Sequence, residues 1–136
     1  MNTFRLREHG RAYLPIYIKR SIDQTMMPVR FKVDTGADVT TISKVTLRNL
    51  GFTKEWIEAH IVKRTQIITA TGDVIESAII QIPVLNLLGY EAKNWTFSIL
   101  LEEKRDLKNL IGRDLLSGFN YKIDNDRDLI EIERTK

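Results

Sequence analysis

The chain has 136 residues, 43% hydrophobic and 29% charged, with a formal net charge of +3. This length and composition fit one globular domain that buries its own core, so we expect a single domain over residues 1–136, with the core at about 13–133 and an N-terminal arm at 1–12. The charge is small and dispersed, which argues against nucleic-acid binding, and the lack of cysteine excludes disulfides, thiolate catalysis and cysteine-bound zinc.

Short runs that alternate apolar and polar residues dominate the first part of the chain, and this is the period of a half-buried strand. The pattern predicts strands over residues 12–18 and 27–33, with a turn between them at 21–24. The β-branched run at 39–42 predicts a third strand.

Two short helices are predicted after these strands. Ser43 is a suitable N-cap for a helix over residues 44–50, and Gly51 can end that helix. Thr53 can cap a second short helix in the same way.

The second half of the chain is again rich in β-branched residues. Residues 61–82 are interrupted at 69–73 by small residues and one glycine, which predicts a hairpin. The remaining expected elements are a turn at Gly89, strands at 95–101 and 110–112, a helical turn within 113–119, and a final hairpin formed by 121–123 and 129–132. The sum is a mainly β domain with one or two short helices.

The triplet Asp34-Thr35-Gly36 directly follows the strand predicted at 27–33. A single triplet of this kind is commonly just a turn. Here a strand leads into it and a β-branched run leaves it, so the triplet would occupy a tight loop opening from the sheet. In such a loop a carboxylate can be held by backbone N–H groups and a neighbouring hydroxyl.

Three further motifs accompany the triplet along the chain. They are Leu50-Gly51-Phe52 after the first helix, the hairpin tip Thr69-Ala70-Thr71-Gly72, and the run from Asn109 to Leu116 that contains Leu110-Ile111-Gly112-Arg113. Together with Phe31–Thr40, they resemble the retroviral-type (retropepsin-like) aspartic proteases in the family's own order. The resemblance extends over roughly residues 13–133.

This resemblance implies a mainly β, retropepsin-like acid-protease half-barrel with one or two short helices, completed by homodimerisation. The chain carries one Asp-Thr-Gly triplet, whereas pepsin-like enzymes carry two such loops in a longer chain. The second carboxylate would therefore be Asp34 of an identical subunit. The implied activity is that of an aspartic endopeptidase acting on proteins or peptides, with Asp34, Thr35 and Gly36 as the catalytic residues and with no metal or cofactor.

The resemblance also implies contacts beyond the triplet. Substrate contacts are implied beside the triplet and in the hairpin that would be the family's flap, from Ala37, Asp38, Thr69, Ala70, Thr71 and Gly72. Asp38 is expected to form a structural ion pair with Arg113. The chain ends are expected to interleave in the sheet of the dimer, with the basic stretch 5–11 near Glu131 and Glu133.

A second function stays open, namely a catalytically silent retropepsin-like module for dimerisation or peptide binding. The intact acid at position 34 favours the enzyme, because a pure binding module does not need it. The acidic run 124–128 resembles the start of a calcium loop, but glycine and glutamate are missing from its sixth and twelfth positions, so we expect no metal site.

No apolar run approaches the ~18 residues of a membrane span, and the N-terminal stretch is charged where a signal peptide is apolar. We therefore expect a cytoplasmic protein with neither a membrane nor a nucleic acid as partner.

Overall fold

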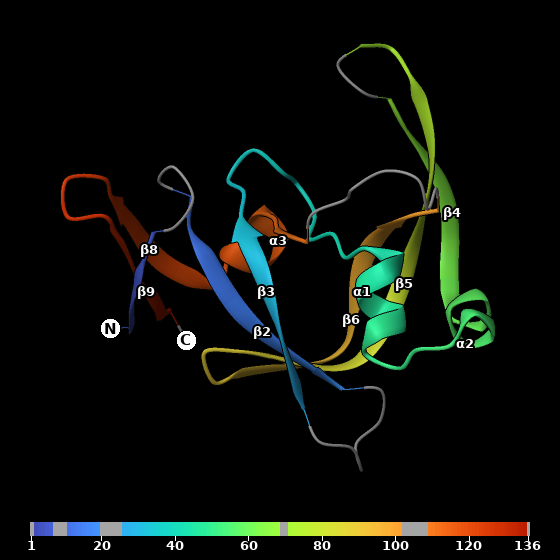
Figure 1. Cartoon of the computed structure of the whole chain (residues 1–136), viewed down its shortest axis with the longest axis horizontal. Coiled ribbons are helices and arrows are strands. Elements are labelled where there is room, and N and C mark those ends of the chain that lie inside the picture. The colour runs from blue at the N-terminus through green and yellow to red at the C-terminus, as the bar shows by residue number, and fades with distance from the viewer. Residues whose placement is uncertain (1, 7–10, 20–25, 69–70, 102–108, 136) are drawn as a thin grey trace.

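We describe a computed structural model of the chain over residues 2–6, 11–19, 26–68, 71–101 and 109–135 (Figure 1). These residues form nine strands in two sheets, together with three short helices. The strands are β1 (Asn2–Arg5), β2 (Tyr13–Lys19), β3 (Met27–Val33), β4 (Ile61–Ile68), β5 (Val74–Leu87), β6 (Tyr90–Leu100), β7 (Leu110–Ile111), β8 (Phe119–Asp124) and β9 (Leu129–Arg134). The helices are α1 (Lys44–Asn49), α2 (Lys54–Ala59) and α3 (Arg113–Leu116).

The larger sheet has the order β4-β5-β2-β3-β7, with β6 paired alongside β5. Its strands are antiparallel except for β3 and β7, which run parallel for two residue pairs, Lys32 with Leu110 and Val33 with Ile111. The smaller sheet has the order β1-β9-β8 and is antiparallel throughout. Figure 1 shows the smaller sheet at one end of the molecule and the β4–β5 hairpin rising from the other.

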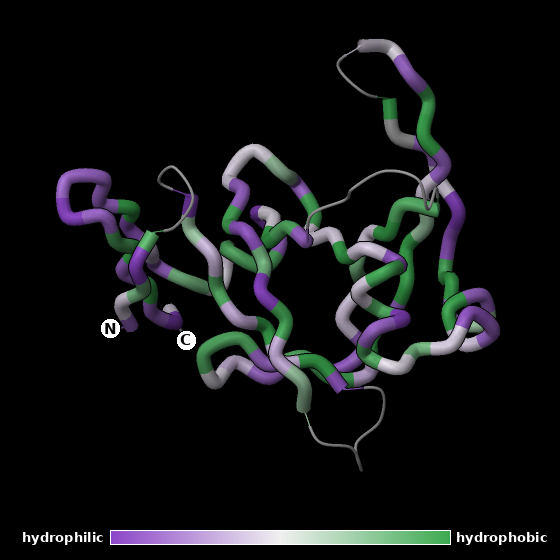
Figure 2. Tube along the Cα trace, viewed as in Figure 1, coloured by the Kyte–Doolittle hydropathy of each residue, from purple (hydrophilic) through white to green (hydrophobic). Residues whose placement is uncertain are grey.

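The core is built from the apolar side of each strand, as the alternation predicts. Hydrophobic and hydrophilic positions follow one another along the strands in Figure 2, and Leu14, Ile16 and Ile18 of β2 are all buried. The rings of Phe31 and Phe97 pack with their centroids 6.1 Å apart. Full burial of one such side chain contributes about 1.5–3 kcal/mol, so this shared core is the main source of stability.

Both predicted helix caps are confirmed. The Ser43 hydroxyl accepts a hydrogen bond from the Thr46 N–H at 3.1 Å, and the Thr53 hydroxyl accepts one from the Trp56 N–H at 3.0 Å. Each helix buries one residue against the core, Leu47 in α1 and Ile57 in α2. None of the helices in the described part of the chain has the length and apolarity needed to span a bilayer.

The strand predicted at residues 39–42 is wrong. The segment forms only isolated bridges, in which Thr41 lies opposite Ser98 of β6 and Leu110 of β7. Backbone hydrogen bonds join Thr41 to Leu110 on one side and Ile42 to Ser98 on the other, so the segment bridges two strands without forming a strand of its own. The turn predicted at 21–24 lies outside the described residues.

Part of the N-terminal arm expected at residues 1–12 is a strand in the structure. Residues 2–5 form β1, which pairs with β9 of the same chain so that Thr3 lies opposite Glu131. Two strands this far apart in the sequence leave no local residue pattern from which their pairing could be predicted. Of the basic stretch expected near Glu131 and Glu133, Arg5 lies opposite Leu129, and residues 7–10 lie outside the described residues.

Candidate active site

The triplet lies where β3 leaves the larger sheet. The backbone N–H of Asp34 donates to the carbonyl oxygen of Ile111 in β7 at 3.0 Å, and the N–H of Val33 donates to the carbonyl of Ala12 at 2.8 Å. Asp34 is half-buried, whereas Thr35 and Gly36 are exposed. Strands on both sides therefore fix the backbone up to Asp34, and the loop opens to solvent directly after it.

The loop holds its own carboxylate. The N–H of Gly36 donates to Oδ1 of Asp34 at 3.0 Å, and the N–H of Ala37 donates to the Asp34 carbonyl at 3.2 Å. A Cβ atom at position 36 would lie 3.3 Å from the same Oδ1, which is a tight contact. Glycine thus lets the backbone approach the carboxylate closely while its N–H orients that group.

A buried polar cluster lies beneath this loop, formed by Thr40, Gly112 and Asp114. Oδ1 of Asp114 accepts three hydrogen bonds: from the Thr40 N–H at 3.0 Å, from the Thr40 hydroxyl at 2.7 Å, and from the Leu115 N–H at 2.7 Å. The Thr40 hydroxyl oxygen in turn accepts a hydrogen bond from the Gly112 N–H at 3.1 Å. Thr40 is fully buried, so these bonds satisfy groups that water cannot reach.

Gly112 is the point of closest approach between the loop and the segment that carries α3. A Cβ atom there would lie 2.5 Å from the carbonyl carbon of Val39 and 2.6 Å from its oxygen. Only glycine allows the two backbones to lie this close. This contact explains the glycine in the Leu-Ile-Gly run.

The first turn of α3 also binds the loop directly. The N–H groups of Arg113 and Asp114 donate to the carbonyl oxygens of Ala37 and Asp38, at 2.8 Å and 3.2 Å. The Arg113 guanidinium forms an ion pair with the Asp38 carboxylate, the pairing expected from the sequence. Their side chains are 63% and 78% exposed, so the pair adds little stability.

Asn109, directly before β7, hydrogen-bonds to the segment that begins α1. Its Oδ1 accepts a hydrogen bond from the Ser43 N–H at 2.9 Å, and its Nδ2 donates to the Thr46 hydroxyl at 3.0 Å. The start of α1 is thereby tied to β7. Thr40, Asn109 and Asp114 had no assigned role in the sequence analysis, and their neighbours in the sequence gave no signal of buried hydrogen bonding.

The β4–β5 hairpin carries the remaining predicted substrate contacts. Thr69 and Ala70 lie outside the described residues, while Thr71 and Gly72 are exposed at the turn, where Gly72 has a φ of 87°. Figure 1 shows this tip well separated from the loop that follows β3. The structure therefore brings Ala37, Asp38 and Arg113 together beside the triplet but leaves Thr71 and Gly72 apart from it.

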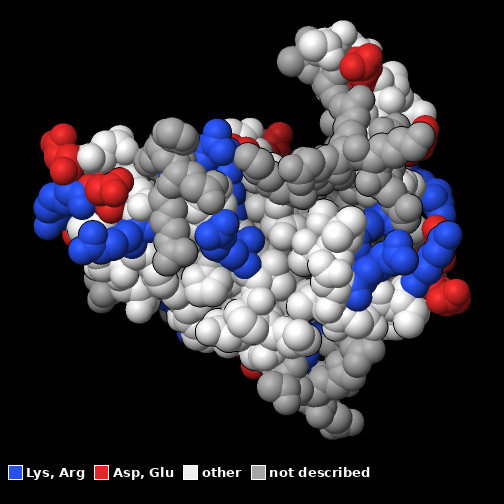
Figure 3. Space-filling model, viewed as in Figure 1, with Lys and Arg blue, Asp and Glu red and all other residues white. Residues whose placement is uncertain are grey.

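The described charged side chains do not form one continuous patch on the face drawn in Figure 3. Figure 3 shows basic and acidic groups dispersed over the visible face. No set of three or more potential metal ligands occurs among the described residues. In the acidic hairpin turn, Asp124 accepts hydrogen bonds from the side chain and the backbone N–H of Arg127, and these bonds lower the pKa of its carboxyl group.

Comparison with known proteins identifies the family. Residues 18–118 match the family model described as "gag-polyprotein putative aspartyl protease". The chain belongs to the retropepsin-like aspartic protease family. A search of curated proteins finds no match to this retropepsin-like chain.

Solved structures show the same fold. A retropepsin-like aspartic protease from Rickettsia conorii is 24% identical over 97% of both chains, with a TM-score of 0.69. EIAV protease, in complex with the inhibitor HBY-793, is 17% identical over 80% of this chain and 88% of its own, with a TM-score of 0.55. The retroviral protease-like domain of Ddi1 from Leishmania major is 22% identical over 93% and 90%, with a TM-score of 0.54. At these identities the likeness shows the fold alone, and it confirms the predicted mainly β, retropepsin-like architecture.

Proposed function

We propose that this chain is an aspartic endopeptidase that works as a homodimer, with the Asp34 carboxylates of two subunits facing each other across a two-fold axis. The observation that carries the proposal is the Asp34 loop itself. It is a half-exposed carboxylate, oriented by the Gly36 N–H, at the end of a strand in a retropepsin-like fold. A single loop supplies one carboxylate, so the site is complete only when a second copy supplies the other.

Two carboxylates at short distance do not both ionise readily, so the pair shares one proton and titrates as a unit. The ionised Asp34 takes a proton from a water molecule as its oxygen attacks the carbonyl carbon of the peptide bond. The protonated Asp34 donates to the carbonyl oxygen, which gives a tetrahedral diol. Transfer of a proton to the amide nitrogen then breaks the C–N bond and releases the amine and the acid.

The other residues support this reaction by position. Gly36 leaves room for the substrate next to the carboxylate, and Thr35, exposed beside it, would bind the loop of the opposite subunit. Ala37 and Asp38 would contact the substrate on the floor of the cleft. The β4–β5 hairpin, as the flap, would cover the substrate from above with residues 69–72.

The test is a digest of a diverse peptide library from acid to neutral pH, with and without a pepstatin-type inhibitor, for the wild type and Asp34→Asn. We expect cleavage with a bell-shaped pH profile, and a loss of kcat/KM of about 100-fold or more in the variant, since it cannot act as base. The dimer mass, measured by sedimentation, should be unchanged. Peptide binding without cleavage at any pH would contradict the proposal and identify a silent binding module.

A further inference from the structure

Among the described residues, one face of the β2–β3 pair carries several cations and no carboxylate other than that of Asp34. In the register of the two strands, Tyr13 lies opposite Lys32. The pairing continues one step beyond β2, because the Ala12 carbonyl accepts a hydrogen bond from the Val33 N–H. Alternate residues of a strand lie on the same side, so the neighbours of the buried residues share this face. They are Arg11, Tyr13, Pro15, Tyr17 and Lys19 along β2 and Pro28, Arg30, Lys32 and Asp34 along β3.

Three of these cations form a basic row that leads to the Asp34 loop, namely Arg30, Lys32 and Arg11. Arg30 and Lys32 precede Asp34 by four and two residues, which corresponds to roughly 13 and 7 Å along a strand. Lys32 and Arg11 are half-buried, and among the described residues neither side chain takes part in an ion pair or a hydrogen bond. Asp38, the other acid of the loop, is already paired. The charges of Lys32 and Arg11 are therefore not neutralised by the described part of the chain.

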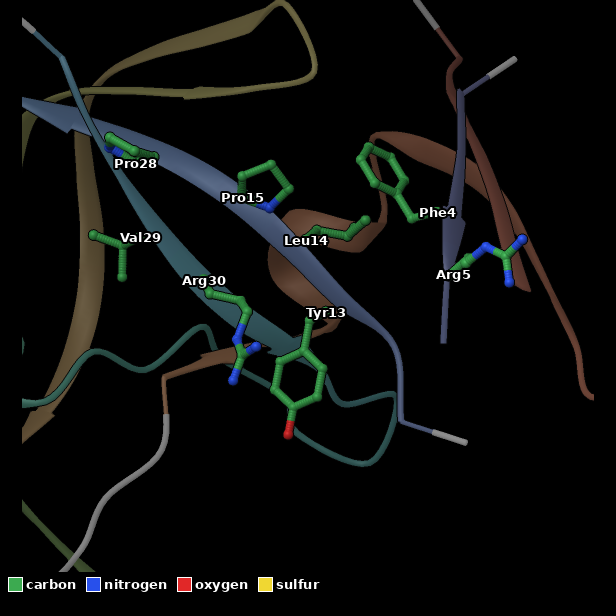
Figure 4. A pocket seen from close by; sticks show the side chains of 8 residues that line it. All are labelled: Phe4, Arg5, Tyr13, Leu14, Pro15, Pro28, Val29 and Arg30. Atoms are coloured by element: carbon green, nitrogen blue, oxygen red, sulfur yellow. The ribbon is translucent and has the colours of Figure 1, made fainter. Parts of the chain in front are cut away.

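Arg30 also lines a cavity of about 380 Å³ that lies between β1 and the β2–β3 pair. One edge of β2 is unpaired here among the described residues, since β2 pairs with β5 only over its last three residues and Pro15 has no N–H to donate. Figure 4 shows Phe4 directed toward β2 and Arg5 directed away from the cavity, so Arg30 is the cation at its rim. The volume lies within the range of ligand pockets, about 300–1,000 Å³. The lining residues are Phe4, Arg5, Tyr13, Leu14, Pro15, Pro28, Val29 and Arg30.

The guanidinium of Arg30 is held in place by the ring of Tyr13. It lies over this ring, 4.5 Å from the centroid. Such stacking orients the cation and keeps its charge, and the N–H groups at its edge still match the geometry of a carboxylate. Single-stranded nucleic acids bind on open aromatic faces, and Arg30 covers one face of this ring. The arrangement therefore favours a carboxylate ligand with an apolar neighbour over a nucleobase.

We propose that the basic row and the cavity form an exosite, a site outside the catalytic cleft that binds an acidic segment of the protein substrate. The inference rests on the proposed endopeptidase function. Carboxylates of the segment bind Lys32 and Arg30, and an apolar side chain between them enters the cavity. An extended peptide advances about 3.3 Å per residue, so the segment lies roughly four to six residues from the scissile bond. The substrate class is thus proteins that carry an acidic stretch with an apolar residue at this distance from the cleaved bond.

The test compares three extensions of one cleaved peptide from the library, Glu-Glu-Leu-Glu, Glu-Glu-Ser-Glu and Gln-Gln-Leu-Gln, each attached at this distance from the scissile bond. We expect the first to have a KM about fivefold or more below that of the third with kcat unchanged, because two ion pairs act on binding alone, and the second to lie between them. The difference should shrink at about 0.5 M NaCl and disappear in the double variant Arg30→Gln/Lys32→Gln. It should persist in Arg30→Lys/Lys32→Arg, which keeps both charges, and in Lys54→Gln at an exposed position of α2.

Binding is also measured without cleavage, by fluorescence anisotropy of the labelled acidic peptide on Asp34→Asn. Equal KM values for the acidic and neutral extensions, or a difference that persists in the double variant, would overturn the exosite and leave the proposed function standing. A chain that cleaves no peptide but binds the acidic one through Arg30 and Lys32 would overturn the proposed function and keep the site, and a chain that does neither would overturn both. A single-stranded RNA of the same length that displaces the peptide at a lower concentration would overturn the choice of a protein ligand.

Discussion

Replacing Thr40 with valine tests whether the cluster beneath the Asp34 loop stabilises the fold. Valine has nearly the same shape but lacks the hydroxyl, which donates to Asp114 at 2.7 Å and accepts from the Gly112 N–H at 3.1 Å. The variant loses a hydrogen bond to a carboxylate and leaves a buried N–H without an acceptor. Each effect costs about 1–3 kcal/mol, so the free energy of unfolding should fall by about 2–6 kcal/mol.

Thr40→Ser is the matched control, because it keeps the hydroxyl and removes only a methyl group, at a cost of about 1 kcal/mol. Urea unfolding can be followed by the fluorescence of Trp56 and Trp95, at one protein concentration because a dimer's stability depends on it. The serine variant should retain most of the kcat/KM of the wild type, and the valine variant should lose more. Equal stability of the two variants would refute the role assigned to the cluster.

Two further changes test other parts of the fold. Gly112→Ala places a Cβ atom 2.5 Å from the Val39 carbonyl carbon and should lower the free energy of unfolding in urea by about 3 kcal/mol or more. Gly118→Ala is the control, because its Cβ atom has its nearest neighbour at 3.7 Å, and it should change that free energy by less than about 1 kcal/mol. Similar losses in both variants would argue against the close approach of the two backbones at Gly112. Because hydrogen bonds from Arg127 lower the pKa of Asp124 below its ordinary value of 3.8, this pair stabilises the fold above that value and the contribution is lost as the pH falls through the lowered pKa. Asp124→Asn should therefore be less stable than the wild type near neutral pH, and the difference should shrink as the pH falls through the lowered pKa; a difference that does not shrink in acid would point to another cause.

The strands and helix starts that were predicted correctly from the sequence are those that depend on a local residue pattern. Alternation marks β2, β3 and the long hairpins, and Ser43 and Thr53 mark the helix starts, because these signals act over a few residues. The acid of the triplet, followed by glycine, identified the candidate site.

The rest depends on contacts between distant segments. β1 is a strand only because β9 is available to it, and residues 39–42 are not a strand because the ends of β6 and β7 each meet them at one residue. Thr40 and Asp114 resemble ordinary surface residues in the sequence. They are 74 residues apart in the sequence, and only the fold brings their side chains within hydrogen-bond distance.

The pairing of β1 with β9 also bears on the order in which the molecule folds. It joins segments at opposite ends of the sequence, which an unfolded chain brings together only at a high cost in loop entropy. We expect this pairing to form late, after the local hairpins and the core. A nascent or truncated polypeptide that lacks β9 then has no partner strand for β1.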